Sequence, residues 1–135
     1  MIEENNLTCS EYIDIINTVR WKIPSKRLLE KSLTNSMTVK YVIGNQTVAM
    51  ARLITDTGYI GLIVDVIVKP KYQGQGIGKK MINNLLDRAK ETLEDSESMM
   101  IQLLSADGKI NFYKQLGFKD KREVVEAGMY MWLRK

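Results

Sequence analysis

A glycine-rich segment in the middle of the chain has the residue types that bind phosphate. Residues 70–80 read PKYQGQGIGKK, so Gly74, Gly76 and Gly78 alternate with other residues and two lysines follow. Glycines cost about 1 kcal/mol each in a helix and make poor strands, so here they favour a turn that a ligand can approach closely. An amphipathic segment begins directly after them. Because a helix N-terminus carries unpaired N–H groups and partial positive charge, the pattern predicts an anion site.

Two common phosphate-binding motifs do not match this segment. A P-loop requires glycine at the position of Gln73 and Ser or Thr at the position of Lys80. The dinucleotide fingerprint G-x-G-x-x-G requires a longer last spacing than the one between Gly76 and Gly78. The pattern that remains is Q-x-x-G-x-G, formed by Gln73, Gly76 and Gly78.

The composition limits the possible chemistry. The 135 residues, of which 44% are hydrophobic, are expected to form one domain over 1–135. The chain has no histidine and only one cysteine, Cys9, so neither an internal disulfide nor a thiolate metal cluster can form. Metal catalysis and catalytic triads of the Ser/His/Asp kind are therefore not expected, and Cys9 has no neighbouring basic group to activate it.

Charge and hydropathy narrow the choice of partners. The net charge is +4, and no acidic residue occurs from Val66 to Leu86, so positive charge is concentrated around the glycines. An ordinary solvated surface would also explain these lysines, whereas nucleic-acid binding usually needs a longer basic stripe or aromatic platforms. No apolar run approaches the roughly 20 residues that cross a bilayer, and no signal-peptide pattern is visible. A cytoplasmic protein without membrane or nucleic-acid partners is expected.

The hydrophobic pattern predicts a mixture of helices and strands. Gly44 and Asn45 separate two strand-like runs and give a hairpin signal, so the strands around them should form a meander. Ser25 is placed to cap a helix. The predicted elements are helices at 8–20 and 25–33, strands at 37–44, 46–55 and 59–68, a helix at 77–93, a strand at 99–104, a short helix at 109–118 that Gly117 ends, and two further extended pieces.

Two segments resemble the hallmarks of the GCN5-related N-acetyltransferase (GNAT) superfamily. The segment VDVIVKPKYQGQGIGKKM is similar to its Q/R-x-x-G-x-G/A signature and to the strand before it, and FYKQLGF is similar to its second hallmark. The resemblance covers about the last 80 residues. In addition, LEKSLTNS, VAMARLITD and GMYMW resemble the small plastid and cyanobacterial branch that includes serotonin N-acetyltransferase-like enzymes.

The resemblance implies a fold and an activity. The expected fold is α/β (α+β), with a mixed, mostly antiparallel sheet of six to seven strands, four flanking helices and a splay after the third main strand. The expected activity is direct transfer of the acetyl group of acetyl-CoA to a primary amine, most simply that of a small molecule. A non-catalytic CoA-binding sensor is the alternative, and a homodimer is a further expectation from the family.

The resemblance also implies cofactor-binding residues, mainly through backbone atoms. The amides from Gln73 to Gly78 would bind the pyrophosphate of acetyl-CoA, with Lys79 or Lys80 adding charge. The end of the third strand would pair with the pantetheine arm, and an amide near Val66 or Ile67 would polarise the thioester carbonyl. The cofactor-binding positions are therefore Val66, Ile67, Val68, Gln73, Gly74, Gln75, Gly76, Ile77, Gly78 and Lys79.

Tyr113, within FYKQLGF, is the expected general acid that protonates the leaving thiolate. The competing interpretation is a core tyrosine that packs at helical spacing with Ile110 and Leu116. The base is less well defined, because Asp65 is the only acid on the third strand. Its side chain should lie on the face opposite Leu62 and Val64, where it could bond a basic neighbour such as Arg52.

Other departures from the family pattern bear on the substrates. A water relay, or an amine that arrives already neutral, would replace Asp65 as the base. The family often places an asparagine at the position of Ala106 to bind pantetheine, and Asn111 is too close to Tyr113 to substitute for it. The acceptor would enter from the opposite side of the splay, where the candidate lining residues are Trp21, Tyr41, Tyr130 and Trp132.

Overall fold

The computed structural model describes residues 1–135 and divides them into two compact units, Met1–Leu104 and Ser105–Lys135. The first unit contains β1 (Ile2–Glu4), α1 (Cys9–Ile16), α2 (Lys26–Thr34), β2 (Met37–Ile43), β3 (Gln46–Thr55), β4 (Ile60–Val68), the 3₁₀ turn η1 (Pro70–Tyr72), α3 (Ile77–Glu91) and β5 (Met100–Leu103). The second contains α4 (Ile110–Gln115) and the 3₁₀ turn η2 (Lys121–Glu123). No helix is long and apolar enough to cross a membrane.

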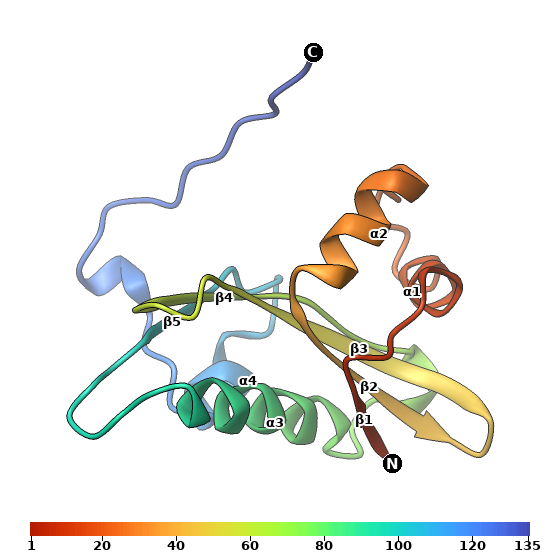
Figure 1. Cartoon of the computed structure of the whole chain (residues 1–135), viewed down its shortest axis with the longest axis horizontal. Helices are drawn as coiled ribbons and strands as arrows, with labels where there is room; N and C mark the ends of the chain where they lie inside the picture. The colour runs from red at the N-terminus through yellow and green to blue at the C-terminus, as the bar shows by residue number, and fades with distance from the viewer. The chain divides into compact units, whose positions relative to one another are not determined.

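The five strands form one mixed sheet in the order β1-β2-β3-β4-β5 (Figure 1). The pairs from β1 to β4 are antiparallel, and β5 joins β4 in parallel. Gly44, with a φ of +60°, lies in the two-residue turn that joins Ile43 to its partner Gln46. The predicted meander of β2, β3 and β4 is therefore confirmed, as is the mixed character of the sheet.

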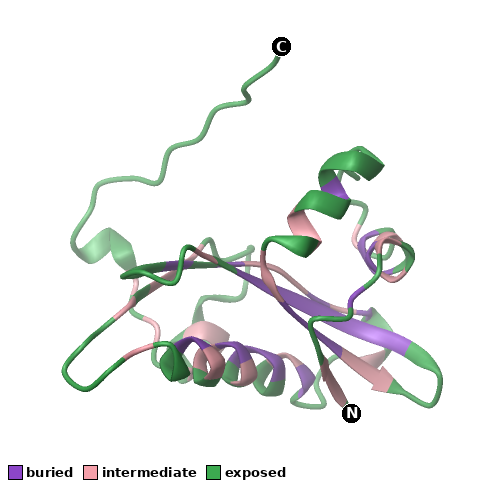
Figure 2. Ribbon diagram, in the orientation of Figure 1, coloured by how far each residue is buried: buried purple, intermediate pink, exposed green.

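Helices cover both faces of the sheet. Figure 1 shows α1 and α2 on one face and α3 on the other. The side of α3 that faces the sheet carries its buried residues, which are Ile77, Met81, Ile82, Leu85 and Ala89, and Figure 2 shows the same pattern in colour. On the opposite face, Tyr12, Ile15 and Leu29 pack with Met50 and Ile67. Burial on both faces explains why the central strands are almost continuously apolar.

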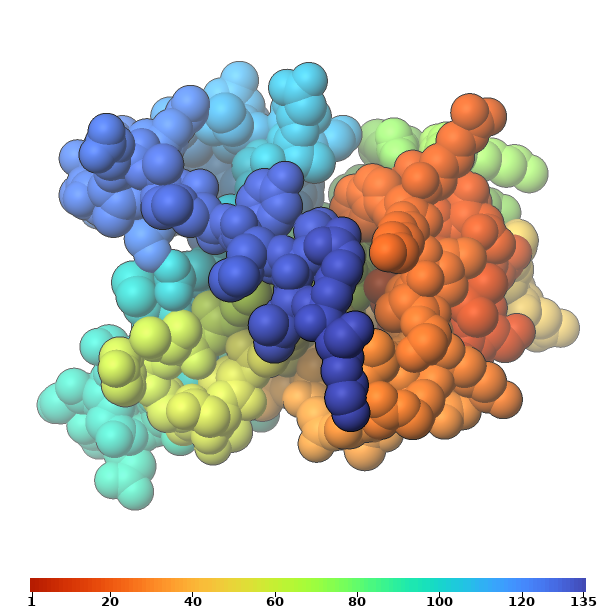
Figure 3. All heavy atoms as spheres, turned by 90° about the horizontal axis from the view of Figure 1, so that it is seen from above, coloured from red at the N-terminus to blue at the C-terminus, as the bar shows by residue number.

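The helix boundaries follow from caps. Thr8 and Glu11 form a capping box at the start of α1, and the Ser25 Oγ accepts a hydrogen bond from Leu28 N at the start of α2. The helix predicted over 8–20 is shorter than expected, because it ends at the cap residue Asn17. In the space-filling view, these N-terminal helices form the red-to-orange part of the surface (Figure 3).

Two differences from the sequence-based expectation concern the ends of the chain. The N-terminal strand β1 was not predicted, since it has only three residues and pairs through its backbone with β2. The two extended pieces predicted at the C-terminus are absent as strands: η2 and residues without regular structure take their place. The sheet has five strands instead of six to seven.

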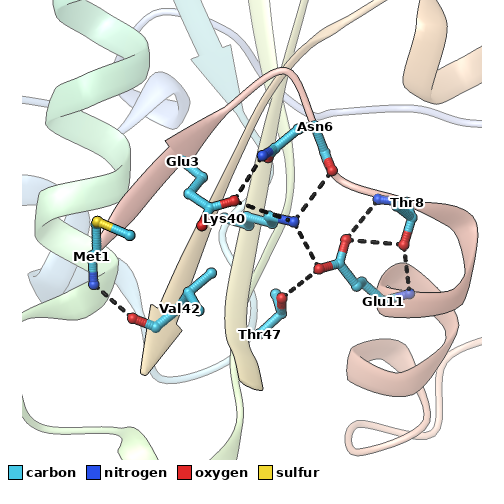
Figure 4. A network of polar contacts seen from close by, with 8 residues as sticks. All are labelled: Met1, Glu3, Asn6, Thr8, Glu11, Lys40, Val42 and Thr47. Atoms are coloured by element: carbon cyan, nitrogen blue, oxygen red, sulfur yellow. Dashed lines mark hydrogen bonds and ion pairs between the residues drawn. The ribbon is translucent and has the colours of Figure 1, made fainter. Parts of the chain in front are cut away.

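A polar network ties the N-terminus to the sheet (Figure 4). The Lys40 ammonium, which is only 7% exposed, donates to Glu11 Oε1 at 2.7 Å and lies 3.5 Å from Glu3. Thr47 donates to the same Glu11 oxygen at 2.6 Å. Burial on its own would raise the pKa of Glu11, but hydrogen bonds from Lys40, Thr47 and Thr8 outweigh it and lower the pKa from 4.5 to about 2.

This network predicts an acid-sensitive component of stability. A carboxylate whose pKa is lower in the folded state stabilises fully above its unfolded pKa, so this contribution should fall as the pH drops from about 4.5 towards 2. We expect Glu11→Gln to cost about 2 kcal/mol at pH 7 and to flatten the loss of stability in that window. Urea unfolding at a series of pH values measures both. Equal pH dependence in the variant and the parent would contradict the assignment.

Candidate functional site

The glycine segment forms an uncapped helix N-terminus. Gly74 and Gly76 have φ values of +75° and +76°, in the left-handed region that favours glycine. Gly76 is the N-cap residue of α3, and no side chain caps the helix there. A Cβ on Gly74 or Gly76 would meet no atom within 4 Å. The first N–H groups of α3 therefore have no capping side chain, as an anion site requires.

Contacts on the other side hold this turn in place. The Gln73 Nε2 donates to the carbonyl oxygen of Val68 at 2.9 Å, which ties the turn to the end of β4. The side chain of Ile77 is only 3% exposed and anchors the first turn of α3 in the core. These two residues of the motif support the turn, and Gly74, Gln75 and Gly76 stay exposed.

The lysines around the turn differ in their partners. Lys69 is 8% exposed, and its Nζ donates to Asp14 Oδ2 of α1 at 2.5 Å, so its charge is neutralised within the fold. Lys80 lies with its Nζ 5.7 Å from the ring centroid of Tyr41. Lys79 is exposed on the first turn of α3. The exposed positive charge around the turn therefore comes from Lys71, Lys79 and Lys80, together with the helix dipole.

The end of β4 is open along one edge. β5 pairs with β4 only from Ile60 to Ile63, and β5 ends at Leu103. β4 continues to Val68, so its last five residues have no partner strand on the β5 side. This is the splay that was predicted after the third main strand. It leaves backbone N–H and C=O groups of β4 available to an extended ligand.

A β-bulge interrupts β4 within this open stretch. Met50 is paired with Ile67 and Arg52 with Val64, so β4 has one residue more than β3 between these pairs. Asp65 lies in this bulge and has a φ of +54°. The extra residue changes the direction of the peptide groups that follow, at Val66 and Ile67.

The structure brings Asp65 together with the predicted partner Arg52. The Arg52 Nε donates to Asp65 Oδ2 at 2.7 Å, and Nη1 of the same guanidinium reaches the carbonyl oxygen of Ser32 in α2. The hydroxyl of Tyr12 in α1 lies near enough to Asp65 for the carboxylate to raise its pKa, a proximity that the sequence did not indicate. Helical spacing identifies Tyr12 as a core residue, but no local pattern indicates which strand its hydroxyl reaches.

Tyr113 belongs to the second unit. It lies in α4, which ends before Gly117, a residue with a φ of +96°. The Tyr113 ring makes edge contacts with the rings of Phe112 and Phe118. Partial burial raises the pKa of the Tyr113 hydroxyl above 10.0. Within this unit Tyr130 and Trp132, two predicted acceptor-lining residues, are 88% and 64% exposed.

A family comparison decides the identity of the fold. The model of the acetyltransferase (GNAT) domain matches residues 36–120, which include the glycine turn and Tyr113. The chain belongs to the GNAT family. As a member it is an acetyltransferase, and the predicted α+β fold of that family is confirmed.

Individual relatives of this GNAT chain agree with the assignment. The uncharacterized N-acetyltransferase ycf52 of Pyropia yezoensis is 31% identical over 134 residues, which cover 96% of this chain and 74% of that protein. The histone acetyltransferase TAP1 of Glycine max is 35% identical over 85 residues, which cover 63% of this chain and 35% of that protein. The crystal structure of a probable acetyltransferase of unknown function from meticillin-resistant Staphylococcus aureus has a TM-score of 0.84 at 24% identity, and the match covers 98% of this chain and 100% of that one.

The glycine turn of this GNAT chain gives a matched test. Gly76 and Gly44 both have positive φ and open space where a Cβ would lie, but only Gly76 is in the motif. We expect Gly76→Ala and Gly44→Ala each to cost about 1 kcal/mol, because alanine is strained in the left-handed region. Only Gly76→Ala should abolish the rise in melting temperature that CoA produces. Equal responses to CoA in the two variants would contradict the site.

Proposed function

We propose that this chain transfers the acetyl group of acetyl-CoA directly to the primary amine of a small molecule. The observation that carries the proposal is the pairing of two backbone features in one unit: an uncapped N-terminus of α3 and an open edge at the end of β4. The first suits a pyrophosphate and the second suits an extended amide-containing arm. CoA carries a pyrophosphate that is followed directly by an extended, amide-containing pantetheine arm.

The proposed binding mode uses backbone atoms for most contacts. The amides from Gln73 to Gly78 bind the pyrophosphate, and Lys79 adds charge at the first turn of α3. The backbone of Val66 and Val68 pairs with the pantetheine arm as an added strand would. An amide of Val66 or Ile67 donates to the thioester carbonyl oxygen, where negative charge develops during the reaction.

The reaction requires no covalent enzyme intermediate. The amine nitrogen attacks the carbonyl carbon, a C–N bond forms, and the C–S bond breaks as the tetrahedral intermediate collapses. The amine loses one proton to solvent, the thiolate of CoA receives one from Tyr113, and the Tyr113 phenolate regains a proton from solvent. Since burial raises the pKa of this hydroxyl, Tyr113 keeps its proton throughout the neutral range and can act as the acid.

The proton of the amine leaves by a route other than Asp65 in this proposal. The carboxylate of Asp65 is paired with the Arg52 guanidinium at 2.7 Å, and both side chains are largely buried, so Asp65 is committed to a partner within the fold. An amine that arrives neutral loses a single proton after its attack, and water can accept that proton, so no carboxylate on β4 is needed. In this proposal Asp65 is therefore not the base; it helps to position the Val66 and Ile67 amides.

A shallow surface hollow of about 340 Å³ lies on α2 and β3. Its lining residues are Leu28, Lys31, Ser32, Asn35, Arg52 and Ile54. We take it as a candidate position for a small acceptor, because it shares Arg52 with the residues around Asp65.

The main competing function is a CoA-binding sensor without catalysis. It is favoured by the absence of an uncommitted carboxylate on β4 and by Ala106 at the position where the family often has asparagine. A sensor would bind CoA and acetyl-CoA and release no thiol with any amine. We also propose that the protein is a homodimer, which sedimentation tests. We further propose that it is cytoplasmic, which cell fractionation tests.

Thermal melts with acetyl-CoA, ATP and NAD in separate wells test the cofactor. A ligand at about 100 times its dissociation constant adds roughly 2.7 kcal/mol, which raises the melting temperature by several degrees. We expect acetyl-CoA alone among the three to stabilise the protein, and a panel of small amines scored by thiol release then to identify the acceptor. Stabilisation by ATP or NAD instead would contradict the proposal. Stabilisation by acetyl-CoA without thiol release across the panel would favour the sensor.

Replacement of the acid gives a second test. We expect Tyr113→Phe to keep the fold and the melting-temperature rise with CoA but to lower turnover tenfold or more, since the phenol no longer donates a proton. Because the pKa of Tyr113 lies above 10.0, loss of its proton should not reduce kcat of the parent below that pH. Unchanged turnover in Tyr113→Phe would assign Tyr113 to packing with Phe112 and Phe118.

A further inference from the structure

The bulge in β4 is held by a buried polar cluster that the proposed reaction does not use. We call this set the bulge clamp, and it consists of Tyr12, Arg52 and Asp65, with Ser32 and Ser36 behind Arg52. These residues come from α1, β3, β4, α2 and the residue pair that follows α2. The sequence separates them by up to 53 positions, from Tyr12 to Asp65.

Arg52 connects the bulge to the end of α2. Its side chain is about 10% exposed and that of Asp65 about 17%, so the pair is largely shielded from water. The Nε donates to Asp65, whereas Nη1 donates to the carbonyl oxygen of Ser32 and to Ser36 Oγ, each at 3.1 Å. Charge-assisted bonds in such surroundings are directional and hold their partners in one geometry.

Asp65 takes a backbone conformation that its neighbours must maintain. Its φ of +54° lies in the left-handed region, where a residue with a Cβ is destabilised relative to glycine. Glycine at this position would form the bulge more easily. An aspartate there forms the same bulge and adds a carboxylate through which α1 and β3 hold it.

Tyr12 closes the cluster from α1. It is 4% exposed, and burial, followed by the charge of Asp65 and a hydrogen bond to it, raises the pKa of Tyr12 to about 12. Its hydroxyl therefore stays protonated and is an uncharged neighbour of Asp65. Asp65 is thus bound by the guanidinium of the adjacent strand and covered by Tyr12 of α1.

The peptide groups that follow the bulge are those of the proposed carbonyl-binding site. Val66 and Ile67 come directly after Asp65, and Ile67 returns to register opposite Met50. The β5 strand does not reach this stretch, so no partner strand fixes it from that side. Its orientation depends on β3 and on the bulge itself.

We propose that Asp65 and Arg52 are positioning residues that set the direction of the Val66 and Ile67 amides toward the thioester carbonyl. The proposal rests on the proposed acetyl transfer and gives Asp65 a role other than that of base. A donor that is misplaced by about 1 Å can cost up to about 100-fold in rate, whereas pyrophosphate binding at the glycine turn should be insensitive to it. Loss of the clamp should therefore lower kcat and leave CoA binding nearly unchanged.

Steady-state kinetics of four variants separate positioning from proton transfer. We expect Asp65→Asn and Arg52→Gln each to lower kcat at least tenfold, with KM for acetyl-CoA changed less than about threefold. The kcat of the double variant should be little lower than that of either single variant, because each single substitution already breaks the Arg52–Asp65 pair. Arg52→Lys should recover part of the loss. If Asp65 were the base, Asp65→Asn would remove a limb of the pH–rate profile and Arg52→Gln would keep most activity, which would overturn the proposal.

Glu11→Gln is the matched control. It removes a carboxylate of similar burial from a polar network on the same helix as Tyr12, but the hydrogen bonds of Glu11 go to Lys40, Thr47 and Thr8 and not to Asp65 or Arg52 (Figure 4). We expect it to lower the melting temperature while kcat of the folded protein stays within about twofold. An equal loss of kcat in Glu11→Gln would show that general destabilisation causes the effect and would overturn the proposal.

Amide hydrogen exchange of the unliganded full chain tests the clamp without reference to activity. We expect exchange of residues 64–68 to accelerate at least tenfold in Asp65→Asn and Arg52→Gln but not in Glu11→Gln, because only the first two release the bulge. Unchanged exchange overturns the clamp even if the protein transfers acetyl groups. If the two variants exchange faster and the parent transfers no acetyl group, the result supports the bulge clamp as a structural feature. The absence of acetyl transfer by the parent then overturns the proposed function separately.

Discussion

The last part of β4 has to belong to a stable sheet and yet keep one edge of its backbone unpaired. Buried N–H and C=O groups without partners are destabilising, so a sheet normally pairs both edges of a central strand. Here β5 pairs with β4 over residues 60–63 alone, and the rest of β4 is held by β3 on one edge and by helices on both faces. The place of the glycine turn depends on that arrangement, as do the proposed position of the cofactor and the proposed direction of the Val66 and Ile67 amides.

The fold of this chain is kept where most side chains differ. It matches a Staphylococcus aureus structure with a TM-score of 0.84 at 24% identity. The proposed contacts to CoA come from amides at a helix N-terminus and at a strand end, and these groups are the same whatever side chains surround them. Such a site depends on φ values and on strand register, as at Gly74, Gly76 and the bulge.

Side chains contribute where the backbone needs support. Gln73 ties the glycine turn to Val68, Lys69 ties the strand end to α1, and Arg52 with Tyr12 holds the bulge at Asp65. Each contact joins β4, or the turn after it, to a neighbouring element. Charged groups near a presumed active site therefore need not act on substrate, since Lys69 and Asp65 are committed to partners within the fold.

The sequence by itself determined what depends on local patterns. The glycine spacing, the hairpin at Gly44, the cap at Ser25 and the helical period after Ile77 predicted the turn, the meander and the helices, because each rests on residues close together in the chain. The tertiary structure decided the pairing of β1, the loss of the expected C-terminal strands, the bulge at Asp65 and the contact of Tyr12 with it. These depend on residues distant in the chain, such as the 53 positions between Tyr12 and Asp65, and on register, which a local pattern does not encode.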